Sequence, residues 1–101
     1  MNSLGFVRGY MAKNMDVENF TKVVATALGR EFDFNVEVNN INDLYLFNLD
    51  NRYKIGVNKT LMLHLMRRSP YALDRYILEN IIEMGYELDK DRSNYVKYIF
   101  I

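Results

Sequence analysis

The sequence predicts an α+β fold: a single domain in which an N-terminal helix and an antiparallel β-sheet pack with a helix-turn-helix pair. Three observations carry this prediction. The chain has 101 residues and no cysteine, and half of its residues are apolar, which is enough for one hydrophobic core without disulfides. Residues 33–57 alternate apolar and polar side chains between turn signals, as strands do. Residues 58–85 repeat apolar side chains at helical spacing on both sides of the single proline.

The expected sheet is a three-strand meander together with a C-terminal hairpin, and residues 1–101 are expected to form one domain in three successive parts. Residues 1–13 give little signal because two glycines interrupt a weak helical spacing, so they form either a flexible arm or a short element. Residues 16–57 hold the first clear helix and the meander. Residues 58–101 hold the helix-turn-helix pair and the hairpin.

The first clear helix is predicted over residues 16–28. Asp16 or Asn14 can accept hydrogen bonds from the free N–H groups at its start. Gly29 suits the end of this helix, because glycine adopts a positive φ at little cost. The apolar stripe that should pack on the sheet consists of Val17, Phe20, Val23, Val24, Ala27 and Leu28.

Three strands are predicted over residues 33–38, 44–49 and 52–57. Asp50-Asn51 suits a two-residue hairpin turn between the second and third strands, since both residues tolerate a positive φ. A two-residue turn sets the pairing of these strands and therefore selects which side chains face the core. The side chains placed in the core by this register are Leu44, Leu46, Ile55 and Val57.

The same register places Tyr45, Phe47 and Lys54 on the opposite face of the sheet. Two aromatic rings beside a lysine can form a platform on which nucleic-acid bases stack. Alternatively, a second layer such as the N-terminal arm covers the two rings. We favour a covering layer, because large aromatic side chains are mostly buried.

Two further helices are predicted over residues 58–66 and 70–84. Asn58 is a good N-terminal cap for the first, and Ser69-Pro70 is a strong start signal for the second. Gly85 suits the end of the second helix. Apolar residues cover most of the circumference of the first helix, which predicts that it is buried on several sides.

Two polar residues lie within these apolar patterns. His64 is the single histidine, and with few partners for catalysis or metal binding we expect it to be hydrogen-bonded at the edge of the core. Asp74 falls inside the apolar arc of the second helix. It is expected to pair with His64 or with an arginine of the turn, or simply to favour the N-terminal region of its helix.

The C-terminal hairpin is predicted from residues 86–88 and 95–101, with a polar loop at 89–94 between them. The loop begins like a calcium-binding loop but lacks the glycine and the final glutamate that such loops need, so no calcium is expected.

Composition excludes several classes of function. Thirteen basic residues balance thirteen acidic ones, whereas a domain that binds nucleic acid is usually basic. We find no constellation of nucleophile, base or metal ligands and no glycine-rich phosphate loop, so neither an enzyme nor a cofactor is expected. Without cysteine, a leader-like start or an apolar run long enough to cross a bilayer, the protein is expected in the cytoplasm and away from membranes.

Residues 58–101 resemble a winged helix-turn-helix domain in the order of their elements, with residues 86–101 as the wing. The resemblance implies that the helix over residues 70–84 enters the major groove of DNA. The exposed face of that helix mixes charges, however, and the acids of the wing tip offset its bases, so DNA binding is disfavoured. These candidate contact residues are Arg75, Tyr76, Glu79, Asn80 and Glu83 on the helix and Lys90 and Arg92 at the wing tip.

The favoured prediction is a small non-enzymatic protein that binds another protein. The chain is rich in Asn, Tyr, Ile and Met, as in proteins from AT-rich genomes, which suggests an inhibitor or modulator from a phage or mobile element that acts on a host or defence protein. The alternative is a winged-helix DNA-binding regulator, and a homodimer is left open. Arg67 and Arg68, in the basic turn, complete the set of candidate partner-binding residues.

Overall fold

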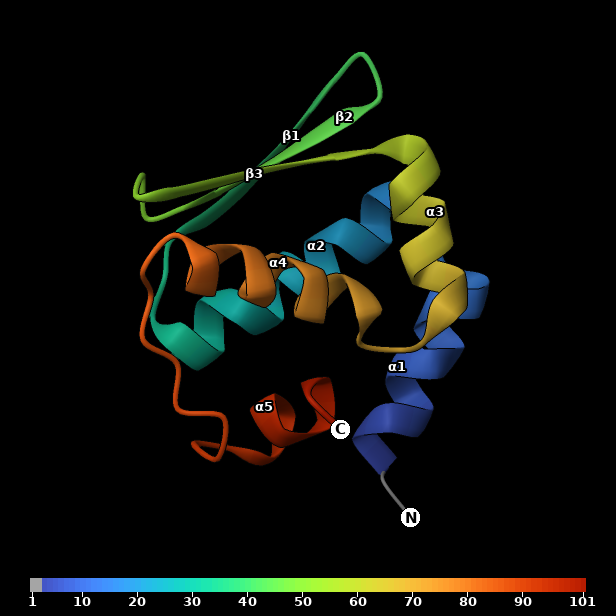
Figure 1. Ribbon diagram of the computed structural model, residues 1–101. Coiled ribbons are helices and arrows are strands. Elements are labelled where there is room, and N and C mark those ends of the chain that lie inside the picture. Colours follow the sequence, from blue (N-terminus) through green and yellow to red (C-terminus); the bar gives the residue numbers. More distant parts are fainter. Residues whose placement is uncertain (1–2) are drawn as a thin grey trace.

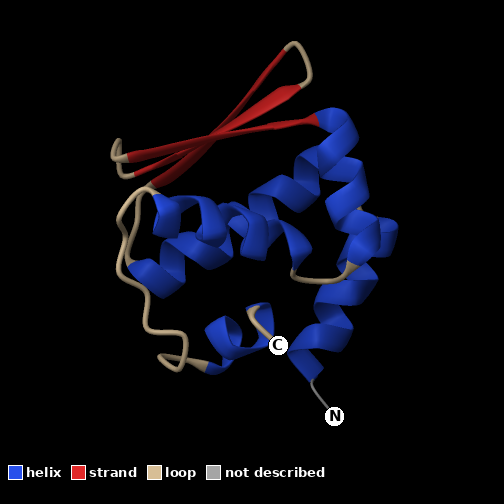
Figure 2. Cartoon of the chain, in the orientation of Figure 1, coloured by secondary structure: helices blue, strands red, loops and turns tan. Residues whose placement is uncertain are grey.

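The computed structural model describes residues 3–101, with side chains from residue 5 onward (Figure 1). The chain forms an α+β fold with one three-stranded antiparallel sheet, as predicted, and the remaining elements are helices (Figure 2). In chain order the elements are α1 (Ser3–Asn14), α2 (Val17–Phe32), β1 (Val36–Ile41), β2 (Leu44–Leu49), β3 (Tyr53–Asn58), α3 (Lys59–Arg68), α4 (Ala72–Glu83) and α5 (Asn94–Ile99).

The sheet has the strand order β1-β2-β3 and lies over α2 and α4 (Figure 1). Its register differs from the predicted one by one residue, because Leu49 pairs with Tyr53 and a three-residue loop joins β2 to β3. Asp50 and Asn51 both adopt a positive φ in this loop, as their residue types allow. The predicted two-residue turn is therefore wrong.

A shift of one residue turns every side chain of β2 to the other face of the sheet. Phe47 pairs with Ile55 and is fully buried, and Tyr45 is buried beside it. Leu46, predicted in the core, is half-buried, and Leu44 is exposed. Both rings are therefore buried, as favoured, but they belong to the main core above the helices, and the second layer predicted on the opposite face is wrong.

α2 begins where it was predicted to begin. Asp16 caps it, and its carboxylate accepts a hydrogen bond of 3.1 Å from the N–H of Asn19. The helix does not end at Gly29 but continues to Phe32 and ends at Asp33, which adopts a left-handed conformation. Gly29 serves a different purpose, because a Cβ at this position would lie 3.0 Å from the carbonyl oxygen of Phe34.

Residues 3–14 form helix α1, so the prediction of a flexible arm is wrong for them and that of a short element is right. α1 lacks an apolar stripe of the usual kind: Phe6, Val7 and Tyr10 are exposed, whereas Arg8 is buried. A buried polar side chain, together with the half-buried Met11 and Ala12, therefore holds this helix to the rest of the molecule, and periodicity does not predict the polar contact.

The helix-turn-helix pair is confirmed, with changes at the turn. Asn58 caps α3 by accepting a hydrogen bond of 2.8 Å from the N–H of Leu61. α4 begins at Ala72, two residues later than predicted, and no side chain caps it, since Ser69 ends α3 instead. Gly85 follows the end of α4 with a φ of 106°, as predicted.

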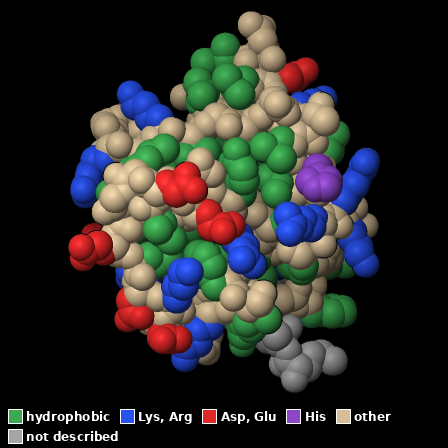
Figure 3. All heavy atoms as spheres, in the orientation of Figure 1, with side chains coloured by type: hydrophobic (Ala, Val, Ile, Leu, Met, Phe, Trp, Pro, Cys, Tyr) green, Lys and Arg blue, Asp and Glu red, His purple; other side chains and the backbone are tan. Residues whose placement is uncertain are grey.

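α3 is less buried than its composition suggests. Met62, Leu65 and Met66 are buried, but Leu61 and Leu63 are only half-buried. His64 is exposed, so the prediction that it is hydrogen-bonded at the edge of the core is wrong; the histidine side chain lies at the molecular surface in Figure 3.

The predicted C-terminal hairpin is wrong. In residues 59–101 the structure contains no strand, and residues 94–99 form helix α5. Ser93 caps α5 by accepting a hydrogen bond of 3.1 Å from the N–H of Val96, and Val96 and Ile99 are both buried, three residues apart on one face. The β-rich composition favours a strand locally, but packing of this face against α4 outweighs that preference.

Within residues 3–101, none of the helices combines the length and the apolar character that crossing a membrane requires.

Candidate functional site

The candidate contact residues fall in three places on the surface. Arg67 and Arg68 end α3, and both are exposed. Neither makes a hydrogen bond or an ion pair with any other residue of the described chain. Cations at the C-terminal end of a helix are favoured by its dipole, but these two guanidinium groups remain available to a partner.

Lys90 and Arg92 precede α5 and do not form a wing tip, because there is no wing. The Nε of Arg92 lies 2.9 Å from a carboxylate oxygen of Glu31, and its Nη2 donates a hydrogen bond of 3.0 Å to the carbonyl oxygen of the same residue. Its guanidinium lies 4.7 Å from the ring centre of Phe32. Lys90 lies 4.6 Å from the ring centre of Phe100. Both cations therefore hold the loop against the molecule, which makes them poor candidates for partner contacts.

The exposed side of α4 carries the other candidates. Arg75 and Glu79 form an ion pair of 3.3 Å one turn apart. Asn80 donates its side-chain amide to the carbonyl oxygen of Tyr76 at 2.8 Å and so stays close to its own helix. Glu83 is exposed further along the helix.

Four of the candidates line one depression, which we call the turn hollow. It has a volume of about 610 Å³ and lies where the turn between α3 and α4 meets α5. Its polar lining comes from Arg68, Arg75 and Glu79, and Tyr76 lines it as well. α5 and the residues after it add apolar surface that no pattern predicted. These added residues are Tyr98, Ile99 and Ile101.

A buried polar cluster of Arg8, Asp74 and Tyr95 lies beneath the turn. Arg8 donates a hydrogen bond to one carboxylate oxygen of Asp74, and the hydroxyl of Tyr95 donates to the other. Asp74 is fully buried and Arg8 is only 6% exposed. Asp74 thus pairs with an arginine, as one prediction had it, but the arginine comes from α1 and not from the turn.

Arg8 also fixes the turn itself. Its guanidinium lies 4.9 Å from the ring centre of Tyr71 and donates a hydrogen bond of 3.5 Å to the carbonyl oxygen of Pro70. The cluster therefore joins α1, the turn, α4 and α5 at one point and positions the turn hollow. No motif in the sequence marks Arg8; the only signal was the carboxylate of Asp74 in an apolar arc, which required a partner.

The cluster shifts the protonation of its members. Burial raises the pKa of Asp74, and the opposite charge of Arg8 reduces that rise. Burial by itself lowers the pKa of Arg8, but the Asp74 carboxylate outweighs it and the pKa of Arg8 is raised. Burial and the neighbouring Asp74 raise the pKa of Tyr95 above that of an ordinary phenol, so its hydroxyl remains a donor.

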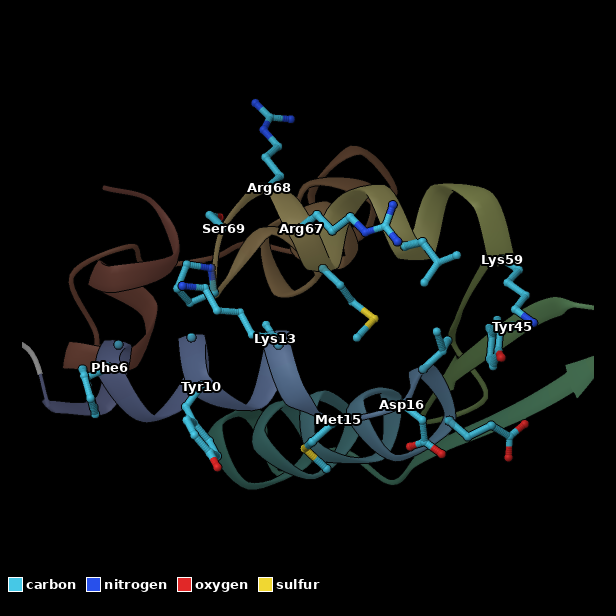
Figure 4. Close-up of a pocket in the computed structure, with 18 residues that line it drawn as sticks. Phe6, Tyr10, Lys13, Met15, Asp16, Tyr45, Lys59, Arg67, Arg68 and Ser69 are labelled. Atoms are coloured by element: carbon cyan, nitrogen blue, oxygen red, sulfur yellow. The ribbon is translucent and has the colours of Figure 1, made fainter.

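A second and larger depression, the α1–α3 groove, runs between α1 and α3 and has a volume of about 1090 Å³. α1 lines it with Gly9, Tyr10 and Lys13, and the end of α3 lines it with Arg67 and Arg68 (Figure 4). Arg68 borders both depressions, whereas Arg67 belongs to the groove alone. Both arginines of the basic turn thus line the groove, and only Arg68 also lines the turn hollow.

Among residues 3–101 the structure places no three His, Cys, Asp or Glu side chains close enough together to hold a metal ion. Comparisons of the chain with protein-family models, with curated proteins and with solved structures find no match.

Proposed function

We propose that this chain is a small non-enzymatic binding protein that holds a segment of another protein in the turn hollow. The observation that carries the proposal is the lining of that hollow, where Arg68, Arg75 and Tyr76 stand beside apolar side chains of α5 and the residues after it. Arginine and tyrosine contribute most of the binding energy at protein interfaces when apolar surface surrounds them. The volume of about 610 Å³ lies in the range of pockets that enclose a small ligand, so it has room for a few side chains of a partner.

The charge pattern favours a protein over DNA as the partner. On α4, Arg75 is paired with Glu79, and Glu83 lies on the same exposed side. Acidic and basic side chains are interspersed on the face of the molecule in Figure 3. DNA binding depends on several cations that contact phosphates without neighbouring carboxylates, and such a mixed surface repels phosphates in part.

Two features argue against the alternative of a winged-helix regulator. α5 stands in place of the wing, and Arg92 is engaged by Glu31. Among the candidate contact residues, Arg67 and Arg68 are exposed cations that make no ion pair or hydrogen bond in the described chain, and they are the residues on which a DNA test should focus.

By this proposal the protein acts as a modulator: it occupies a surface of a host or defence protein, in keeping with an origin in a phage or mobile element. Binding would be tested with tagged protein in extract of the cells in which the chain is naturally made. The wild type and Lys54→Glu, a charge change on the exposed face of β3, should recover the same protein in equal amount. The variants Tyr76→Ala and Arg75→Glu should recover it at least about tenfold less.

A mobility shift on random duplex DNA across a salt series tests the alternative. The proposal expects no shift at physiological salt. Binding that falls steeply with salt and disappears in the double variant Arg67→Glu/Arg68→Glu would contradict the proposal and favour a DNA-binding regulator.

A further inference from the structure

The α1–α3 groove has an apolar lining that is only half covered by the rest of the molecule. Ala12, Met15 and Val17 line it, are half-buried and pack against the core. Leu63 of α3 is half-buried as well, and the buried Met66 completes the lining. We call these five side chains the groove floor. Covering the exposed part of such apolar surface favours the binding of a partner that is itself apolar on one side.

The free charges of the groove are cations. Three exposed basic side chains line it and make no ion pair or hydrogen bond with any residue in the described part of the chain. They are Lys13, Lys59 and Arg67. The two carboxylates in the lining both have contacts within the chain, since Asp16 caps α2 and Glu18 accepts a hydrogen bond of 3.1 Å from the side-chain amide of Asn40. The groove therefore attracts acidic groups.

The three cations are spread along the groove. In Figure 4, Lys59 lies beside Tyr45 at one end, Arg67 lies along α3, and Lys13 extends from α1 toward the other end. Arg68 also borders the groove, but its side chain points away from α1 in this view. One phosphate or one carboxylate cannot contact cations that are separated in this way. The arrangement therefore fits an elongated ligand that carries several acidic groups.

We propose that the α1–α3 groove binds an acidic amphipathic helix of another protein. The apolar stripe of this helix covers the groove floor, and its carboxylates face Lys13, Arg67 and Lys59. A groove between two helices is a common place for a third amphipathic helix to dock. A helix about 10 Å wide that rises 1.5 Å per residue occupies about 120 Å³ per residue, so a groove of about 1090 Å³ holds roughly two turns.

An acidic helix matches both features of the groove, whereas nucleic acid matches only one. Phosphates supply separated negative charges, but the phosphate backbone gains nothing from an apolar floor. The proposal also goes beyond the turn hollow. None of the three cations lines that hollow, so the two surfaces can be tested separately.

Fluorescence anisotropy with a synthetic peptide tests the groove on the whole chain. The probe is a labelled peptide of about 15 residues, with leucine at helical spacing and glutamate and alanine at the other positions. We expect a dissociation constant below about 100 μM. Two control peptides, one with lysine in place of glutamate and one with serine in place of leucine, should each bind at least about tenfold more weakly.

Charge reversal in the protein locates the binding site. The double variant Lys13→Glu/Arg67→Glu should bind the glutamate peptide at least about tenfold more weakly and should bind the lysine peptide better than the wild type does. Lys54→Glu, a single charge change on the outer face of the sheet, and Tyr76→Ala, in the turn hollow, should leave the affinity unchanged. Circular dichroism and thermal unfolding verify that each variant is folded.

Four outcomes would overturn the proposal. The first is no binding of the glutamate peptide up to about 1 mM. The second is equal binding of the serine control, because the groove floor would then play no part. The third is full affinity in the double variant. The fourth is tighter binding of random duplex DNA than of the glutamate peptide in a competition experiment, which would favour nucleic acid as the ligand of these cations.

Discussion

The sheet end and the α1 end of the molecule are held together by opposite kinds of chemistry. At the sheet end, Phe47, Leu49 and Val57 are completely buried among other apolar side chains. At the α1 end, the buried polar contact is the Arg8–Asp74–Tyr95 cluster, and Phe6 and Tyr10 of α1 face water. Both ends contain apolar contacts, but only the α1 end adds a buried ionic cluster to them.

Because the two ends differ in this way, they should respond differently to substitution of their residues. Apolar packing is nondirectional, so the sheet end should lose stability in proportion to the volume removed. A buried ionic cluster is directional: it contributes little net stability when intact, but removing one member leaves an unpaired charge in the interior. The α1 end should therefore tolerate loss of the whole cluster better than loss of one residue.

The largest effect is expected at the sheet end. Phe47→Ala should lower the free energy of unfolding by about 4 kcal/mol, because it leaves a large cavity in the core. Leu46→Ala, one residue earlier on the half-buried outer face, should cost less than about 1.5 kcal/mol. Urea denaturation measures both values. Equal losses at the two positions would contradict the register of β2 and β3.

At the α1 end, Arg8→Ala should lower the free energy of unfolding by about 3 kcal/mol, because it leaves the carboxylate of Asp74 buried without its cationic partner. The triple variant Arg8→Met/Asp74→Leu/Tyr95→Phe should recover most of this loss, since no charge then remains buried. Urea denaturation of both variants checks the comparison directly. A triple variant no more stable than Arg8→Ala would show that the α1 end needs its charges for stability.

Alkaline pH should destabilise the α1 end through the titration of Tyr95. Because the folded pKa of Tyr95 is raised above the unfolded value, the native state holds a proton that the unfolded state releases above about pH 10. This contribution is complete below pH 10 and is lost as pH rises, at up to about 1.4 kcal/mol per pH unit. Tyr95→Phe should reduce the slope of unfolding free energy against pH in this range. An unchanged slope would show that a group other than Tyr95 causes the pH dependence of stability.

The smallest effect concerns the caps of the helices at the α1 end. Ser93→Ala should cost about 1 kcal/mol, since Ser93 accepts a hydrogen bond from the N–H of Val96 at the start of α5. Ser69→Ala should cost clearly less, because no side chain caps α4. Thermal unfolding of the two variants decides between them. A larger loss of stability for Ser69→Ala than for Ser93→Ala would instead support the predicted helix start at Ser69-Pro70.

Local features of the sequence predicted local structure well. Asp16 and Asn58 accept hydrogen bonds at the helix starts that their positions indicated, and Gly85 follows α4 with the positive φ expected of it. These features involve only neighbouring residues, so they leave a signal in the sequence. The same is true of the exposed charged residues on α4, of which Arg75 and Glu79 line the turn hollow.

The tertiary structure decided what depends on residues far apart in the chain. One extra loop residue at Arg52 set the register of β2 and brought Phe47 into the core. Contact with α4 made a helix of a segment whose residues favour strands. Arg8 pairs with Asp74 although 66 positions separate them in the chain. The energy of this pair depends on its burial, which no local pattern in the sequence encodes.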